Sequence, residues 1–202
     1  DIICKNDTSA KVMIVCTELC TLHFQRESSI NSITSSLLFA DGSAAALVTH
    51  DSFEKKGLHI DGFYSEVISK GKNDMSWELS SSGFLMTLSG YVPELIEEDF
   101  GSLVNKAAAH AGISKEQISH WCIHPGGKRI LDAIGHSLRF ENNELAYCYD
   151  ILREYGNMSS PTILFVLQKI MAQFTGNEKQ NVFAAAFGPG LTMETFVASA
   201  NA

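Results

Sequence analysis

Short apolar runs of strand length alternate with segments of helical periodicity along most of the chain. In residues 92–111 apolar side chains recur at steps of three and four, and Gly112 supplies the stop. The runs at 181–188 and 191–199 flank a tight Gly-Pro-Gly turn. This alternation predicts an α/β fold, and the two closing runs predict an antiparallel pair within a mixed sheet.

The same reasoning assigns the remaining segments. Residues 11–17 are β-branched and apolar, which predicts a buried strand, and residues 69–77 form a polar stretch that predicts a loop. Ser114 with Gln117 resembles a capping box. Further strands are expected at 41–50, 57–68, 83–88 and 118–124, and helices at 28–38, 127–137, 144–155 and 161–174.

Charge and composition exclude some partners. With 202 residues and a formal charge of -8, the chain can bury one core but lacks the basic face that nucleic acid or an anionic membrane requires. No apolar run is long enough for a membrane span. The five cysteines are scattered without a disulfide framework, so reduced thiols in the cytoplasm are expected.

The first residues predict a fragment. The chain begins at Asp1 without an initiator Met, and residues 1–4 read as the end of a helix before a turn at Asn6-Asp7. Such a helix end ordinarily has more chain ahead of it.

His124 lies where a predicted strand ends and a helix begins. Clefts form at the carboxyl ends of strands in α/β sheets, and Gly126 and Gly127 allow a ligand to approach closely. The helix start, with Lys128 and Arg129, suits an anion such as a nucleotide phosphate. From these residues alone, a ligand-facing histidine and a histidine that only packs at a strand end stay equally open.

Asn157 lies in a second candidate segment, YGNMSSP at residues 155–161. Gly156 ends one helix, and Ser160 with Pro161 suits the start of the next. An asparagine fixed between two helices can donate a hydrogen bond to an oxyanion, although asparagine is also a common turn residue.

A metal site is not expected. Cys16, Cys20 and His23 have ligand chemistry, but no fourth ligand follows at a suitable spacing.

Five segments resemble, in order, the C-terminal half of the chalcone synthase family, the type III polyketide synthases. They are VCTELCTLHF at 15–24, LLFADGSAAALV at 37–48, HPGG at 124–127, YGNMSS at 155–160 and FGPGLTMET at 187–195. Residues 73–93 look more like the bacterial members than the plant ones. The resemblance implies a thiolase-like fold, with residues 1–50 ending its first half and residues 51–202 forming the C-terminal domain, a mixed sheet between helix layers.

By this resemblance, His124 and Asn157 belong to a Cys-His-Asn catalytic set. The family's nucleophilic cysteine would lie upstream of Asp1, so these 202 residues alone are expected to be inactive. The implied reaction is the decarboxylative condensation of malonyl-CoA onto an acyl-CoA starter. Coenzyme A thioesters are then the substrates, and no cofactor is required.

The resemblance also implies substrate-contacting residues. Phe39 matches an aromatic gate, Lys128 and Arg129 are expected near the coenzyme A phosphates, and Met86 replaces an aromatic gate of the plant enzymes. The remaining cavity positions are Cys20, His23, Trp77, Ser159, Gly188 and Pro189. The bulk of His23 and Trp77 argues against a phenylpropanoid starter and favours a fatty-acyl starter that gives an alkylpyrone or alkylresorcinol.

Two alternatives remain at this stage. A ketoacyl-carrier-protein synthase III shares the fold and the Cys-His-Asn set, but its histidine is usually followed by Gln-Ala-Asn rather than Pro-Gly-Gly. A non-catalytic acyl-CoA-binding protein of the same fold would lack the nucleophile. Because half a thiolase-like fold leaves a large face uncovered, we expect it to associate with the missing N-terminal part or with itself, and the family implies a homodimer.

Overall fold

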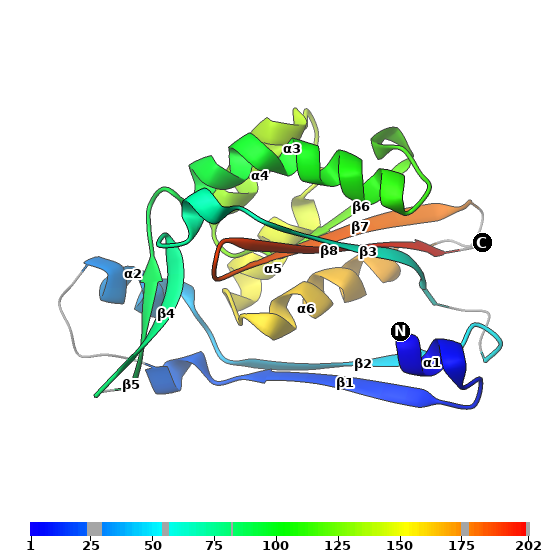
Figure 1. Cartoon of the computed structure of the whole chain (residues 1–202), viewed down its shortest axis with the longest axis horizontal. Helices are drawn as coiled ribbons and strands as arrows, with labels where there is room; N and C mark the ends of the chain where they lie inside the picture. The colour runs from blue at the N-terminus through cyan, green and yellow to red at the C-terminus, as the bar shows by residue number, and fades with distance from the viewer. Residues whose placement is uncertain (24–29, 54–56, 82, 175–177, 201–202) are drawn as a thin grey trace.

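A mixed four-stranded sheet forms the centre of the protein, as the computed structural model shows for residues 1–23, 30–53, 57–81, 83–174 and 178–200 (Figure 1). Its order is β3-β8-β7-β6, with β3 at His59–Val67, β8 at Thr192–Ala200, β7 at Gln180–Gly188 and β6 at His120–Ile123. β6 runs parallel to β7, and the other pairs are antiparallel. The predicted α/β class and the closing antiparallel pair are confirmed.

Helices cover both faces of this sheet (Figure 1). α3 (Val92–His110) and α4 (Lys128–Leu138) lie on one side, and α6 (Ser160–Met171) lies on the other. α5 (Ala146–Tyr155) contacts α4, α6 and the edge strand β6. The apolar stripe of α3 faces the sheet, so that the Phe100 and Phe183 rings meet edge to face at 6.2 Å. Phe183 also packs against Trp121, with ring centroids 5.4 Å apart.

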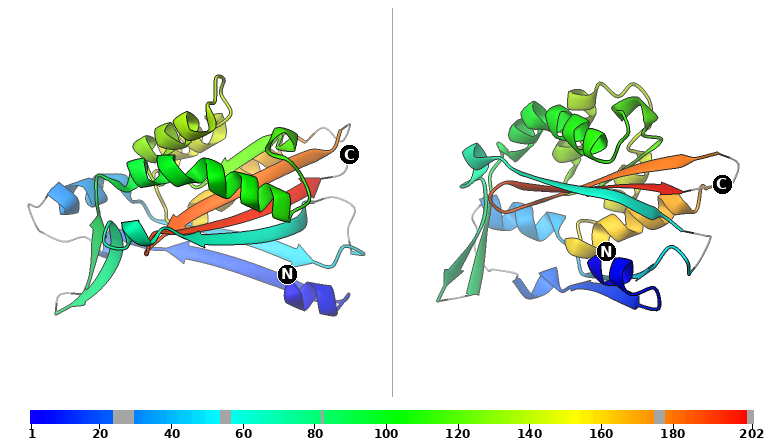
Figure 2. Two further views of the ribbon diagram at one scale, coloured as in Figure 1. Left: turned by 45° about the horizontal axis from the view of Figure 1, so that its top comes forward. Right: turned by 45° about the vertical axis from the view of Figure 1, so that its right-hand side comes forward.

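A separate two-stranded ribbon lies on the far side of α6 (Figure 2). It pairs β1 (Lys11–Glu18) with β2 (Gly42–Thr49), and it is joined to α1 (Ile2–Asn6), the 3₁₀ turn η1 (Cys20–His23) and α2 (Ile30–Leu38). The prediction of a buried strand at 11–17 is wrong about burial. Met13 is 60% and Val15 65% exposed, because only the opposite face of the ribbon packs on α6.

The remaining elements stand beside the sheet. A 3₁₀ turn, η2 (Ser69–Gly71), leads to a hairpin of β4 (Met75–Ser80) and β5 (Gly83–Leu88). The predicted loop at 69–77 is therefore wrong at its end, since Met75 pairs with Leu88 across the hairpin, a contact that local polarity does not reveal. The predicted capping box is confirmed, and it closes the 3₁₀ turn η3 (Lys115–Gln117). No helix in the described ranges is long and apolar enough to cross a membrane.

Candidate active site

His124 directly follows β6 at the carboxyl end of the strand. Its backbone N–H donates to the Ala185 carbonyl at 2.8 Å, which continues the pairing with β7. Its own carbonyl accepts from the Gly126 N–H at 2.9 Å in a tight turn. A Cβ on Gly126 would lie 3.6 Å from His124 Cδ2, so the imidazole packs across the glycine backbone. The turn therefore fixes where the ring can lie.

The half-buried imidazole favours its neutral form. Burial lowers the pKa of His124 from 6.5 to about 4, because the imidazolium would be removed from water. At neutral pH one ring nitrogen therefore carries a proton that can be donated in a hydrogen bond, without a formal charge.

Asn157 is held in the junction between α5 and α6. The residue is 3% exposed, and its Oδ1 accepts the Ser159 N–H at 2.9 Å. This bond identifies Nδ2 as the other end of the amide, and Nδ2 donates to the Gly126 carbonyl at 3.2 Å. One Nδ2 hydrogen thus has no partner among the described residues and is available to a ligand.

A cavity of about 130 Å³ brings the two side chains together. Of the residues predicted from the sequence, it is lined by His124, Asn157, Phe39, Met86, Ser159, Gly188 and Pro189. Gly126, which the sequence placed where a ligand can approach closely, also lines the cavity. Sequence reasoning missed four lining residues, which are Met75, Leu88, Ile130 and Phe187. Phe187 directly precedes the predicted Gly188, whereas Met75 carries no local signal.

Three predicted cavity positions are not among these lining residues. Cys20 lies in η1, and burial, followed by the nearby Glu18 and Asp41 carboxylates, raises the pKa of its thiol. The side chains of His23 and Trp77 fall outside the part of the chain that the structure describes.

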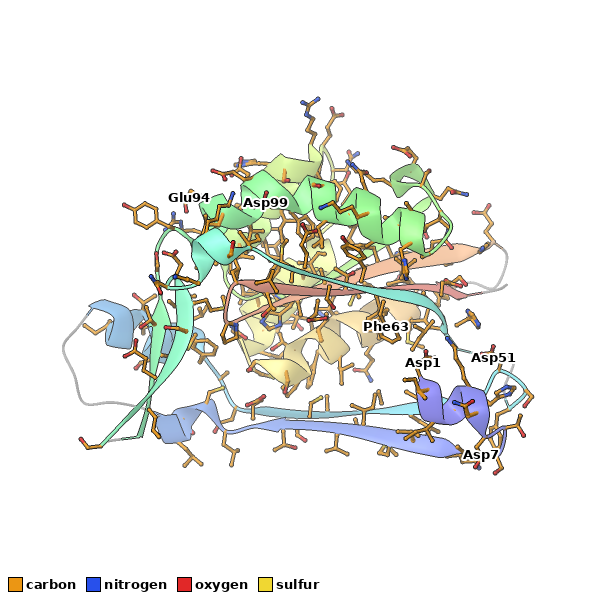
Figure 3. The ribbon with its side chains drawn as sticks, viewed as in Figure 1. Asp1, Asp7, Asp51, Phe63, Glu94 and Asp99 are labelled. Atoms are coloured by element: carbon orange, nitrogen blue, oxygen red, sulfur yellow. The ribbon has the colours of Figure 1, made fainter. Side chains whose placement is uncertain are left out.

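Lys128 and Arg129, predicted near coenzyme A phosphates, are paired with carboxylates. Lys128 Nζ lies 2.8 Å from Asp132, and Arg129 lies 2.9 Å from Glu94 on α3, the helix that carries the Glu94 label in Figure 3. Both cations are exposed at the start of α4. A phosphate at this position would have to compete with the two acids.

None of the chain's five cysteines, all of them described, lines the cavity. Cys122 in β6 and Cys148 in α5 are both buried, and burial raises the pKa of Cys148 to about 12. No group of three or more metal-ligating side chains gathers in the described residues. Among the described residues, the polar side chains at the cavity include His124 and Asn157, both of which can donate hydrogen bonds.

A mixed sheet with helices on both faces is the arrangement of a thiolase-like fold, and His124 and Asn157 line one cavity beside this sheet. The chain belongs to the family of chalcone and stilbene synthases, whose C-terminal domain model matches residues 61–201.

Known relatives agree with this assignment. The chain is 30% identical, over 97% of its length, to a Bacillus subtilis (strain 168) protein named "Putative chalcone synthase", and it covers 56% of that protein. It also superposes on 1,3,6,8-tetrahydroxynaphthalene synthase from Streptomyces coelicolor A3(2), a bacterial type III polyketide synthase. That match has a TM-score of 0.90 at 27% identity and covers 100% of this chain and 57% of the synthase.

A second solved structure, PKS-I from the brown alga Ectocarpus siliculosus, gives a TM-score of 0.87 at 25% identity. This match covers 98% of the present chain and 54% of that protein. The chain thus has a thiolase-like fold and spans about half the length of the relatives that it matches.

Proposed function

We propose that this chain is the C-terminal part of a type III polyketide synthase, an acyltransferase that condenses malonyl-CoA with an acyl-CoA starter. The observation that carries the proposal is the convergence of His124 and Asn157 on one cavity, with Asn157 Nδ2 held as a donor. The nucleophilic cysteine would come from a segment outside these 202 residues. Without that segment the chain has no group to carry the acyl intermediate.

In the first step the cysteine thiolate attacks the starter thioester, and coenzyme A leaves as its thiolate, which takes a proton from water. The His124 imidazole assists by stabilising the thiolate. The acyl group is then held as a cysteine thioester beside the cavity, with Phe39 as part of its wall.

In the second step malonyl-CoA loses carbon dioxide. The electrons of the broken C–C bond move onto the thioester oxygen, where the N–H donors of His124 and Asn157 stabilise the enolate. The enolate carbon then attacks the acyl-cysteine carbonyl, a new C–C bond forms, and the cysteine thiolate leaves. The product is a coenzyme A thioester two carbons longer than the starter.

The cavity wall favours an aliphatic starter. Met75, Met86 and Leu88 of the hairpin supply flexible apolar surface without a charged group. We propose a fatty-acyl starter and an alkylpyrone or alkylresorcinol product. Much faster turnover of coumaroyl-CoA than of long-chain acyl-CoA by the protein extended with its cysteine segment would contradict this assignment.

We further propose a cytoplasmic homodimer that needs no cofactor beyond its coenzyme A substrates. Lys128 and Arg129 would contact the phosphates by exchanging their carboxylate partners, Asp132 and Glu94. The free thiols of the five cysteines agree with a reducing compartment.

The test is malonyl-CoA decarboxylation by the protein that includes the cysteine segment. His124→Gln and Asn157→Asp should each lower the rate by about 10²–10³-fold. Glutamine does not place its amide N–H where the imidazole N–H lies, and aspartate replaces the amide donor with a carboxylate, which only accepts. His120→Gln is the matched control, since His120 begins the same strand β6 and bonds to Gln180, away from the cavity. A wild-type rate in either site variant would refute the roles assigned here.

The same assay separates the alternatives. A ketoacyl-carrier-protein synthase would require malonyl-carrier protein rather than malonyl-CoA as extender. A non-catalytic acyl-CoA-binding protein would bind the thioester without releasing carbon dioxide, and its upstream segment would lack a cysteine in a Gly-Cys-x-Ala-Gly context.

A further inference from the structure

Residues 38–40 run from the last residue of α2 toward β2, and Phe39 at their centre forms an isolated parallel bridge with Asn157. The Asn157 N–H donates to the Leu38 carbonyl at 3.0 Å, and the Ala40 N–H donates to the Asn157 carbonyl at 2.9 Å. Both backbone polar groups of Asn157 are thus bound by one short segment that lies more than a hundred residues earlier in the sequence. We name residues 38–40 the bridging segment.

The bridging segment also packs against both glycine turns of the site. A Cβ on Gly156 would lie 3.3 Å from the Ala40 Cβ and 3.3 Å from the Leu38 carbonyl oxygen. On the other side, both δ-methyl groups of Leu38 lie 3.8 Å from the place of a Cβ on Gly127. Gly156 has a φ of +73° and ψ of -167°, a conformation that is essentially restricted to glycine. The segment therefore lies between the turn that carries His124 and the turn that carries Asn157.

We propose that Leu38 and Ala40 are positioning residues for Asn157, an inference that rests on the proposed function. The two backbone bonds fix the Asn157 backbone, while Ser159 and Gly126 fix its side-chain amide. With four bonds in place, the free Nδ2 hydrogen keeps one direction relative to His124. A displacement of a donor by about 1 Å can cost about 10²-fold in rate, so this support contributes to turnover rather than to binding.

The same bridge carries Phe39, whose side chain lines the cavity. Phe39 lies between the two residues that bond to Asn157, so the wall that faces the acyl group and the donor that faces the oxyanion belong to one rigid unit. Neither can shift without the other unless the bridge breaks.

The first experiment removes one bond of the bridge without altering a side chain. Ala40 is replaced by its α-hydroxy acid in the protein that includes the cysteine segment, which turns the donating N–H into an ester oxygen. We expect kcat for malonyl-CoA decarboxylation to fall about 10–100-fold, with KM changed less than about threefold.

The matched control makes the same replacement at Ala111. The Ala111 N–H donates to the Ala107 carbonyl at 3.1 Å at the end of α3, so it also loses one backbone bond, but it does not line the cavity. Equal kcat values for the two ester variants would overturn the proposal, and a loss confined to residue 40 would support it.

A spectroscopic readout separates this proposal from the proposed function. In the same protein labelled with ¹⁵N-asparagine, the Asn157 side-chain NH₂ signals are assigned by their loss in Asn157→Asp. We expect these signals to move in the residue-40 ester and to stay in place in the residue-111 ester. If the unmodified protein failed to decarboxylate malonyl-CoA, the proposed function would fail, while this measurement would still decide whether the bridging segment positions Asn157.

A second variant uses ordinary mutagenesis. Leu38→Ala removes the methyl groups beside Gly127 and should lower kcat about 3–10-fold and shift the same NH₂ signals. Leu37→Ala is its neighbour and control, since Leu37 is 84% exposed. Unchanged NH₂ signals in Leu38→Ala together with the residue-40 ester would refute the positioning role.

Discussion

The two sets of strands on either side of α6 have similar apolar sequences and opposite burial. In β7, residues 182–185 (VFAA) are at most 1% exposed, because helices cover both faces of the sheet. In the ribbon, Val15 and Leu47 are 65% and 57% exposed, although KVMIVCTE is as apolar as a core strand. An apolar strand sequence therefore indicates that burial of its side chains would be favourable. Whether they are buried depends on which elements pack against the strand.

The ribbon therefore has one apolar face that no other described element covers. Its inner face packs on α6, and its outer face presents Met13, Val15 and Leu47 to solvent. Exposed apolar surface of this extent is typical of an interface.

The largest expected effect comes from truncating the sheet core. Phe183→Ala should lower the free energy of unfolding by about 3–5 kcal/mol, because Phe183 is fully buried between Phe100 and Trp121. Val15→Ala in the ribbon should cost less than about 1 kcal/mol. Urea denaturation of both variants measures the two costs, and equal costs would contradict the burial contrast.

Acid should lower the free energy of unfolding, because His124 at the end of β6 must take up a proton. Its folded pKa of about 4 lies below the ordinary 6.5, so the unfolded chain takes up a proton first as the pH falls. Stability is complete above pH 6.5, declines between pH 6.5 and 4, and loses at most about 3 kcal/mol from this group. In urea titrations at several pH values, His124→Gln should lack this part of the decline, and an identical pH profile would exclude the depressed pKa.

A methyl group added where the ribbon packs against the residue after Asn157 should have an intermediate effect on the free energy of unfolding. Gly42 begins β2, and a Cβ there would lie 2.4 Å from the sulfur of buried Met158. Gly42→Ala should cost about 1–3 kcal/mol through overpacking. The control is Gly135→Ala in α4, where nothing lies within 4 Å of the added carbon, and it should gain about 0.5–1 kcal/mol of helix stability. Thermal unfolding compares the two.

The smallest change in stability is expected on the outer face of the ribbon. Val15→Lys with Leu47→Lys should change the free energy of unfolding by less than about 1 kcal/mol, since both positions are exposed. The 202-residue chain should self-associate through this face, and the double variant should reduce that association in sedimentation velocity. Equal association of both proteins would show that another surface is responsible.

The local patterns of the sequence predict most elements of the fold because each rests on nearby residues. The apolar stripe of α3, the Gly156 stop and the strand end at His124 all come from residues within a few positions of one another. The exposure of β1 could not be predicted in this way, since it depends on which elements face the ribbon. Met75 was missed for the same reason, because its strand forms only by pairing with β5.

In the candidate site, too, some features could be predicted from the sequence and others could not. The resemblance of the HPGG and YGNMSS segments to a known family led to His124 and Asn157, and the structure shows that both line one cavity. The orientation of the Asn157 amide depends on the Gly126 carbonyl and the Ser159 N–H, which are backbone groups without a sequence signature. No local pattern in the sequence predicts the backbone hydrogen bonds of Asn157 with Leu38 and Ala40 either.

That pairing has a consequence for how such enzymes can be recombined. A chimera joined at residue 50 would take its C-terminal domain, with His124 and Asn157, from one parent and residues 38–40 from the other. Both side chains proposed to be catalytic would be retained, yet the backbone segment that bonds to Asn157 would be exchanged. Functional crossovers should therefore fall before Leu38, so that the segment is inherited together with the asparagine that it holds.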